Sequence, residues 1–465
     1  MSRYLMIDFG STFTKLTAVD TEIEDVVATA SSFTTVDTDI TIGYQNALKV
    51  LSQKLGEENP SFDKIIACSS AAGGLKMAAI GLIPELTMEA SRRVCLGAGA
   101  KVELSFSHHL SNSDIEKIKE RNIDIIMLSG GTDGGNQECV LFNQEMLAKS
   151  SIKIPIIYAG NKDAVDRAKE IAKEYQLNEY FCSNVMPKLN VLNIDEPREL
   201  IRKIFLGNII EAKGVKKIEK EIDKVILPTP ESVLRAVTLL ADGYMRESGL
   251  GEIVLLDIGG ATTDMYSICS ASAKRSDVVI KGLEEPYAKR TVEGDLGMRY
   301  SALGVLNSLS QEEIRLINQE ENVDLEKELT YRHNNVDVVP DTEEQKKIDV
   351  IMGRICVDKA MARHVGKMEE TYTPMGMLYN QHGKDLSLIN QVIGTGGVLV
   401  HNENPEKILS AVLYDRKKGL ELRPQNPRYM IDKDYILASM GLLAEIDPLL
   451  ALKIMKKRIV ALPQQ

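Results

Sequence analysis

The sequence predicts an α/β protein built from two related halves. Strand-like and helix-like segments alternate along its 465 residues, which is typical of parallel α/β units. In addition, the strand–turn–strand stretch LMIDFGSTFTKLTAV at 5–19 returns as VLLDIGGATTDMYSI at 254–268. The aligned pairs, at a constant offset of 249 residues, are Asp8 with Asp257, Gly10 with Gly259, and Thr14 with Thr263. This repeat indicates an internal duplication.

The length of the chain calls for several domains, because roughly 150 residues per domain predicts two to four. We expect a first half at 1–149 and an additional α/β region at 150–229. A connecting helix at 230–248 then leads into a second half at 249–430. A closing helix within 431–465 is expected to return to the first half.

The expected elements follow from hydrophobic spacing and turn residues. The first half is expected to contain strands at 5–9, 13–20, 21–35, 64–73, 77–83, 101–108 and 124–128, and helices at 42–56, 84–100 and 111–122. The additional region is expected to contain strands at 154–160 and 179–187 and helices at 161–175 and 196–210. Further helices are expected at 230–247, 346–366 and 435–446, with an exposed loop at 337–347.

Composition narrows the class of protein. Hydrophobic content of 44% and charged content of 26% are ordinary for a soluble globular chain. No run of 18 apolar residues occurs, so we expect no membrane span. The N-terminus enters a patterned strand at once, without the features of a signal peptide, so we expect a cytoplasmic protein.

Cysteine spacing and charge argue against two further kinds of site. The six cysteines include no CxxC pair, so the chain offers no local zinc or iron–sulfur motif, and we expect buried free thiols. The net charge is −11 and aromatic residues make up 5%. The lysine-rich stretch 211–224 alternates with acids, as on a solvated helix. We therefore expect no nucleic-acid binding.

The two repeated turns are suited to phosphate chemistry. Glycine lets the backbone approach a ligand and present N–H groups to phosphate oxygens, and Ser11, Thr12 and Thr262 add hydroxyl groups. Asp8 and Asp257 end the first strand of each repeat, and two carboxylates repel a phosphate. They fit a Mg²⁺ ion between acid and phosphate, or the orientation of an attacking water.

Two glycine-rich loops lie at similar distances from these acids. SGGTDGG at 129–135 begins about 120 residues after Asp8, and IGTGG at 393–397 begins about 135 residues after Asp257. This spacing suggests that the two loops are counterparts in the duplicated halves. We interpret Asp133 in the first loop as structural.

These motifs together resemble the superfamily of actin, Hsp70 and sugar kinases. DFGSTFTK is similar to its first phosphate loop, DIGGATTD to its second, and IGTGG to its adenosine loop. PESVLRAVTLLADG and ILASMGLLA resemble its two connecting helices. The resemblance implies a duplicated, ribonuclease H-like, actin-like ATPase fold, with the halves facing across a cleft that holds ATP and Mg²⁺.

The same resemblance implies roles for individual residues. Asp8 would hold Mg²⁺-bound water, and Asp257 would act on the second side of the metal. Glu231 would place the attacking water. Contacts to phosphate would come from Gly10, Ser11, Thr12, Lys15, Gly259, Gly260, Ala261 and Thr262, and contacts to adenosine from Gly394, Gly396 and Gly397.

Within the superfamily, the chain resembles the MutL/GlmL family associated with adenosylcobalamin-dependent glutamate mutase. The stretches that carry this are MIDFGSTFTKLTAVD, MLSGGTDGGN, IYAGNKDA, LLDIGGATTD, KRTVEGDLGMR and IGTGGVL. The resemblance implies an ATP-driven chaperone or reactivating factor whose client is such a mutase. A small-molecule kinase and an actin-like assembly protein remain alternatives. The identity of the mutase, a second subunit and a homo-oligomer stay open.

Overall fold

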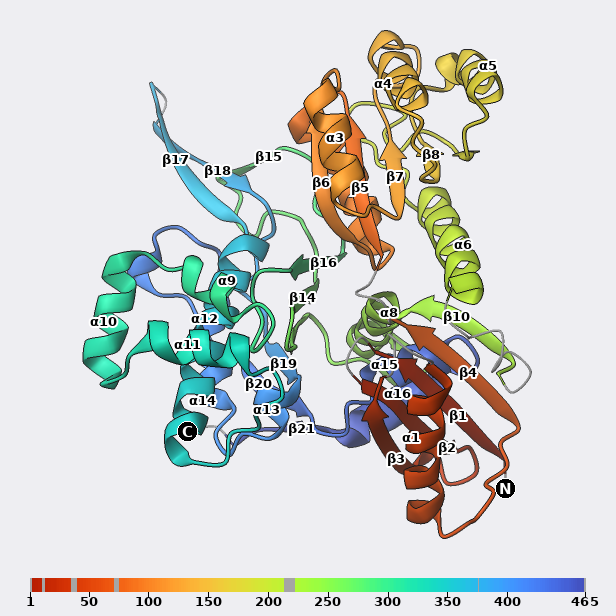
Figure 1. Ribbon diagram of the computed structural model, residues 1–465. Coiled ribbons are helices and arrows are strands. Elements are labelled where there is room, and N and C mark those ends of the chain that lie inside the picture. The colour runs from red at the N-terminus through yellow and green to blue at the C-terminus, as the bar shows by residue number, and fades with distance from the viewer. Residues whose placement is uncertain are drawn as a thin grey trace. The chain divides into compact units, whose positions relative to one another are not determined.

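The computed structural model describes residues 2–10, 13–34, 40–70, 75–212, 222–374 and 376–463 (Figure 1). The chain divides into two compact units, each described separately below. Unit 1 comprises Met1–Ala236 and Ala438–Ile454, and unit 2 comprises Val237–Leu437 and Met455–Gln465.

Unit 1 contains a five-stranded sheet in the order β10-β4-β1-β2-β3. Its strands are β1 (Arg3–Phe9), β2 (Phe13–Asp20), β3 (Asp25–Phe33), β4 (Lys64–Ser69) and β10 (Lys224–Pro228). The pairs β1–β2 and β2–β3 are antiparallel, whereas the pairs β1–β4 and β4–β10 are parallel.

Unit 2 repeats this arrangement in the order β16-β14-β13-β19-β20-β21. The strands are β13 (Ile253–Ile258), β14 (Thr263–Ile268), β16 (Ala288–Glu293), β19 (Gln391–Thr395), β20 (Arg428–Asp432) and β21 (Ile459–Ala461). Again the first three strands are antiparallel, and the next two run parallel to the first. The same order and the same directions in both units confirm the predicted duplicated α/β fold.

Helix α1 (Ile40–Leu55) packs on the five-stranded sheet of unit 1. Its buried residues are Ile40, Gly43, Tyr44, Ala47 and Leu51. These positions are three or four residues apart, so they form one stripe of the helix. The stripe packs with Leu5, Ile7 and Leu16 of the sheet in one hydrophobic core.

A second, fully parallel sheet of unit 1 lies between β4 and β10 in the chain, in the order β6-β5-β7-β8-β9. Its strands are β5 (Lys76–Gly81), β6 (Lys101–Ser107), β7 (Ile125–Leu128), β8 (Ile156–Tyr158) and β9 (Glu179–Phe181). Its helical segments are η1 (Pro84–Met88), α2 (Glu89–Gly97), α3 (Asn112–Glu120), α4 (Glu138–Lys149), η2 (Lys162–Ala164) and α5 (Val165–Tyr175). We call this part, residues 75–190, the inserted sheet.

The predicted equivalence of the loops at 129–135 and 393–397 is wrong, because the first loop belongs to the inserted sheet. The strand that corresponds to β19 in unit 1 is β4, because each is the parallel neighbour of the first strand. The loop at 129–135 follows β7 of the inserted sheet, so it is not the counterpart of the loop at 393–397. The inserted sheet also continues across residue 150, where the sequence predicts the start of an additional region.

Asp133 has a structural environment. Its Oδ1 accepts hydrogen bonds from Lys162 N at 3.0 Å and from Asn184 Nδ2 at 2.9 Å. Asn161 Nδ2 donates to the carbonyl oxygens of Gly135 and Asn136. These contacts join the loops that follow β7, β8 and β9.

Helix α6 (Asp195–Ala212) follows the inserted sheet and leads toward β10 (Figure 1). It contacts α2 and β8 of the inserted sheet at one end and β10 of the first sheet at the other. Helix α8 (Thr229–Asp242) begins directly after β10. The sequence predicted α6 within two residues of its observed ends. It predicted α8 to extend to residue 247, but the helix ends at Asp242 because residues 243–248 form a hairpin.

The core of unit 2 is built around α12 (Glu343–His364), which buries Ile348, Met352, Ile355 and Cys356 against β13 and β19 residues. The other helical segments of this unit are α9 (Ala302–Asn307), α10 (Gln311–Glu321), α11 (Leu325–Asn334), α13 (Gly397–Val400), α14 (Glu406–Leu409), η3 (Ser410–Val412) and η4 (Arg416–Lys418). The predicted exposed loop at 337–347 is therefore shorter than expected, because Thr342 caps α12 by accepting a hydrogen bond from Gln345 N at 3.2 Å.

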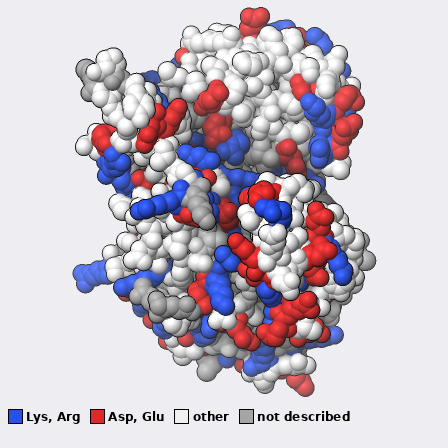
Figure 2. Space-filling view, turned by 90° about the vertical axis from the view of Figure 1, so that its left-hand side faces the viewer, with Lys and Arg blue, Asp and Glu red and all other residues white. Residues whose placement is uncertain are grey.

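Small sheets and two terminal helices complete the described elements. Unit 2 contains a hairpin of β11 (Gly243–Tyr244) and β12 (Glu247–Ser248), and a sheet of β15 (Val278–Lys281), β17 (Lys367–Thr373) and β18 (Gly376–His382). Helices α15 (Leu437–Ala444) and α16 (Pro448–Arg458) follow β20. No helix in the described ranges is both long and apolar enough to span a bilayer. Figure 2 shows acidic and basic side chains interspersed over the face that it displays.

The inserted sheet contains a half-buried acid, Glu179, for which we predict a pH effect on stability. Gln144 Nε2 donates to Glu179 Oε2 at 2.6 Å, and burial raises the pKa of Glu179 from 4.5 to about 7. Because an acid with a raised pKa holds its proton in the folded state, the contribution of Glu179 to stability is greatest below pH 4.5 and is lost as the pH rises through 7. We expect Glu179→Gln to remove this fall and to stabilise unit 1 at pH 8 by at most about 3 kcal/mol.

Urea unfolding at pH 5 and pH 8, followed in both proteins, measures this effect. Glu170→Gln is the matched control, because Glu170 is exposed on α5 and pairs only with the neighbouring Arg167 at 2.8 Å in the described contacts. An unchanged pH dependence in Glu179→Gln would show that this carboxyl group does not produce it.

Candidate functional site

The two repeated turns have the same backbone geometry. In unit 1, Gly10 N donates to Phe13 O at 3.1 Å, and in unit 2 Gly259 N donates to Thr262 O at 2.9 Å. These donors and acceptors occupy aligned positions of the repeat. The duplication seen in sequence is thus also a duplication of the turn that connects the first two strands. Ser11 and Thr12 lie outside the described residues.

Asp8 lies near the end of β1 and is 5% exposed. Its Oδ1 accepts a hydrogen bond of 2.6 Å from Thr229 Oγ1, at the start of α8. The Cys68 thiol of β4 lies 3.5 Å from the same oxygen. In the register of β1 and β2, Asp8 is opposite Lys15. Thr229 therefore joins the first connecting helix directly to the first acid.

Asp257 occupies the aligned position in β13, where it is half-buried and lies opposite Asp264 of β14. Asp264 is paired with the buried Arg290, whose Nη2 lies 2.6 Å from Oδ1. It also accepts a hydrogen bond from Thr262 Oγ1 at 3.2 Å. Arg290 thus offsets the negative charge that replaces Lys15 at the equivalent position.

The segment 294–301 supports the second turn from one side. Met298 N donates to Gly259 O at 3.0 Å and Arg299 N to Gly260 O at 2.8 Å, while Ser301 Oγ donates to Ala261 O at 2.6 Å. In the described part of the chain, the N–H groups of Gly260 and Ala261 donate to no protein acceptor. A turn whose carbonyl groups are bound and whose N–H groups are available is suited to bind an anion.

Close packing makes a glycine necessary in this support. A Cβ on Gly297 would lie 2.5 Å from the carbonyl carbon of Ala261. Only a residue without a side chain permits this approach of the two backbones. Gly297 belongs to the stretch KRTVEGDLGMR, so its role explains one part of that motif.

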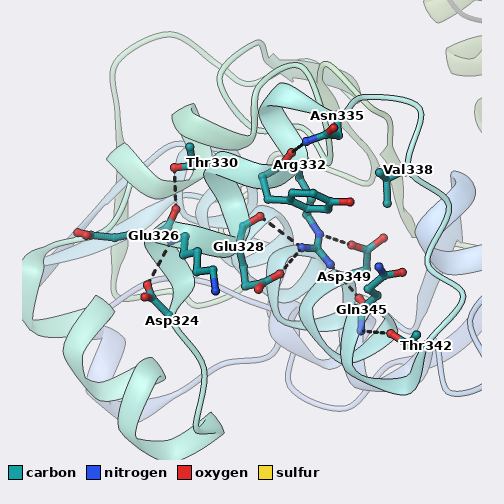
Figure 3. Close-up of polar contacts among 12 residues, drawn as sticks. Asp324, Glu326, Glu328, Thr330, Arg332, Asn335, Val338, Thr342, Gln345 and Asp349 are labelled. Atoms are coloured by element: carbon teal, nitrogen blue, oxygen red, sulfur yellow. Dashed lines mark hydrogen bonds and ion pairs between the residues drawn. The ribbon is translucent and has the colours of Figure 1, made fainter.

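An ionic network on Asp349 holds Arg299 in place, and Figure 3 shows the part of this network around Arg332. Its Nη2 lies 2.8 Å from Asp349 Oδ2 and donates to Val338 O at 3.0 Å. Asp349 Oδ1 is 2.7 Å from Nε of Arg332, which is 1% exposed. Arg332 also donates to Gln345 O and pairs with Glu328. The network connects α11 and α12 to the segment beneath the second turn.

The predicted adenosine glycines differ in accessibility. Gly394 is buried in β19, and a Cβ there would meet the side chain of Leu399 at 2.8 Å. Gly396 has φ +101°, and a Cβ would lie 2.3 Å from Ile258 O, directly before the second turn. Gly397 is exposed at the start of α13. Among these three glycines, Gly397 is the one exposed to solvent. At Gly394 and Gly396 a side chain would clash with the residues packed around the loop.

Tyr435 is a neighbour of this loop that sequence reasoning missed. Its hydroxyl lies 3.8 Å from where a Cβ of Gly397 would be. Burial, and after it the negative charges of Asp257 and Asp432, raises the pKa of the Tyr435 hydroxyl. The hydroxyl therefore stays protonated at neutral pH and is able to donate a hydrogen bond. Tyr435 is not part of any glycine motif, so the sequence gave no reason to place it near this loop.

Glu231 lies on the first turn of α8 and is 5% exposed. Its carboxylate is bound by two arginines. Arg202 Nε of α6 lies 3.2 Å from Oε2, and Arg202 Nη2 also contacts Oε1. Arg235 Nη2, one turn along α8, lies 3.0 Å from Oε1. The acid that the resemblance assigns to water placement is thus held in an ion-pair network.

The oxygen donors at both turns fit a magnesium ion. Asp8 and Asp257 each present a carboxylate beside a glycine turn, and Mg²⁺ favours one or two carboxylates together with phosphate oxygens and water. Within the described ranges, no cluster of three or more His, Cys, Asp or Glu forms a site built by the protein alone.

Comparison with known proteins identifies the family. A family model described as MutL protein matches residues 4–459. The chain belongs to the MutL family. It is 50% identical over 460 residues to Protein MutL of Clostridium tetanomorphum, and this alignment covers 99% of the chain and 100% of that relative. Both matches therefore extend over both units of the chain.

Solved structures are more distant from this MutL chain. A diol dehydratase-reactivating factor in nucleotide-free form shares 11% identity and has a TM-score of 0.35, with 96% of this chain and 99% of that chain covered. A xylulose kinase from Lactobacillus acidophilus also shares 11% identity, with a TM-score of 0.34 and coverage of 100% and 93%.

Proposed function

We propose that this MutL protein binds and hydrolyses ATP, with Mg²⁺, to reactivate an adenosylcobalamin-dependent mutase similar to glutamate mutase. The observation that carries the nucleotide part is the repeated turn, with the same hydrogen bond at Gly10 and Gly259 and an acid two residues earlier in each unit. Membership of the MutL family, and the association of that family with glutamate mutase, supports the choice of client.

In this proposal the two turns bind the phosphates. The N–H groups of Gly260 and Ala261 and the ammonium group of Lys15 donate hydrogen bonds to phosphate oxygens. Asp8 and Asp257 hold the metal and its water molecules, with Thr229 fixing one oxygen of Asp8. When bound, Mg²⁺ would neutralise charge on the phosphates. Glu231 orients the attacking water once its carboxylate is available.

Hydrolysis would be coupled to reactivation through the γ-phosphate contacts. We propose that a nucleotide bound by both turns favours closure of the two halves and that loss of the γ-phosphate allows them to separate. A shift of a two-state equilibrium from 1:99 to 99:1 takes about 5.5 kcal/mol of differential binding. Charge-assisted hydrogen bonds contribute about 1.5–3 kcal/mol each, so a few of them are sufficient. A client bound to both halves would be strained and would release its damaged cobalamin.

Phosphate release from Mg-ATP tests this function. We expect slow release by the protein alone and faster release when glutamate mutase loaded with inactive cobalamin is added. Release that is indifferent to the mutase would argue against the client. Transfer of the γ-phosphate to a metabolite would identify a kinase, and nucleotide-dependent sedimentation would identify an assembly protein.

A further inference from the structure

The start of α8 is in contact with residues of the inserted sheet and of α6. Gly99, after α2, has φ +84°, and a Cβ there would lie 2.9 Å from Pro228 Cβ and 3.3 Å from Glu231 N. Arg202 of α6 binds the carboxylate of the same Glu231. The inserted sheet therefore lies against the backbone of this residue, while α6 binds its side chain.

Helix α6 is itself packed on the inserted sheet. A Cβ on Gly97, at the end of α2, would lie 2.1 Å from Nη2 of Arg198. The guanidinium group of Arg198 thus lies directly against the α2 backbone, one turn of α6 before Arg202. Burial lowers the pKa of Arg198, while the charge of Glu231 acts in the opposite direction. A movement of the inserted sheet would therefore be transmitted to α6 and to Arg202.

The two arginines that bind Glu231 come from different helices. Arg235 is four residues from Glu231 on the same helix and also pairs with Glu445, so its contact moves with α8. Arg202 comes from α6, and its fork reaches both oxygens of the carboxylate. A two-point contact of this kind fixes the direction of the carboxylate as well as its position. Only the Arg202 contact depends on where α6 lies.

We infer that Arg202 is a latch on Glu231, through which the inserted sheet keeps ATP hydrolysis slow until a protein client binds that sheet. This inference rests on the proposed function. In the latched state the carboxylate faces two guanidinium groups instead of the attacking water. A client that shifts α6 withdraws Arg202 and frees Oε2 of Glu231 to accept a hydrogen bond from that water, while Arg235 still holds Oε1. Arg202 is a positioning residue in this scheme, since it acts through Glu231.

Phosphate release by Arg202→Ala, without and with the mutase, tests the latch. We expect the rate without client to rise about tenfold, which corresponds to about 1.4 kcal/mol, the scale of one charge-assisted hydrogen bond. Adding the mutase should then accelerate release very little. General damage to the fold would lower the rate, so an increase distinguishes the latch from a merely structural ion pair.

Two further variants keep the test decisive. Arg202→Lys retains the charge but loses the fork, and we expect a smaller increase even if the alanine variant folds poorly. Arg315→Ala is the matched control, because Arg315 is an exposed arginine of α10, outside the inserted sheet, whose ion pair is with Glu312. It should retain both the wild-type rate and the wild-type response to the mutase.

The failures of the two proposals are distinguishable. Wild-type turnover that the mutase accelerates, together with an unchanged or lower rate in both Arg202 variants, would overturn the latch alone. An absence of turnover in the wild type and in every variant, with the mutase present, would overturn the proposed function and the latch together.

Discussion

Asp257→Asn is expected to lower phosphate release from Mg-ATP by about 10²–10⁴-fold while the protein stays folded, in keeping with the loss of one positioned acid. The amide keeps the shape of the side chain but removes the charge that would hold Mg²⁺ and its water. Asp257 is half-buried at the end of β13, where Arg290 already neutralises the neighbouring Asp264. No other carboxylate of that strand pair is therefore available to replace it.

Steady-state phosphate release and thermal unfolding of the same preparation measure this effect. Asp277→Asn is the control, because Asp277 is an exposed acid of unit 2 paired with Arg275. Wild-type turnover by Asp257→Asn would contradict the assignment of the second turn.

Asp349→Ala should destabilise unit 2 by about 3–5 kcal/mol, since it leaves the buried charge of Arg332 and the half-buried charge of Arg299 without their shared carboxylate. For a unit of roughly 200 residues this corresponds to a fall in Tm of about 10 °C. The loss should also weaken nucleotide binding, because Arg299 N supports the second turn at Gly260.

Differential scanning calorimetry, with and without Mg-ATP, checks this prediction. Lys346→Ala on the same helix is the matched control, because its ion pair with Glu343 is exposed and such pairs contribute at most about 1 kcal/mol. A fall in Tm no larger than that of the control would show that the network in Figure 3 does not stabilise the unit.

Sequence reasoning identified the duplicated halves because the repeat is local. Each repeat is a strand, a glycine turn and a strand within 15 residues, and its hydrogen bond at Gly10 or Gly259 needs no distant partner. The same holds for α1, whose buried positions follow helical spacing. Local patterns of this kind are the part of a fold that one sequence carries directly.

Sheet membership was harder to predict. The buried parallel strands β4, β5 and β7 have similar apolar sequences, so nothing local shows that β4 belongs to one sheet and the other two to another. Pairing across a long insertion is a tertiary property. This is why the loops at 129–135 and 393–397 appeared equivalent, although one follows the inserted sheet.

The side chains that contact the candidate site residues could not be predicted from the sequence either. Thr229 reaches Asp8 across 221 positions, and Arg202 meets Glu231 only because α6 passes the start of α8. The stretch PESVLRAVTLLADG pointed to Glu231 but gave no reason to single out Thr229, which lies just before it. Residues that position a predicted acid become visible only when the elements are packed.

The most direct test of the account is the release of inactive cobalamin from glutamate mutase, followed by absorbance after the protein is removed. We predict that cobalamin leaves the mutase when this protein and Mg-ATP are both present, and that Asp257→Asn or omission of ATP abolishes the release. Cobalamin release at the same rate without ATP, or none at all while ATP is being hydrolysed, would contradict the proposal that hydrolysis drives reactivation.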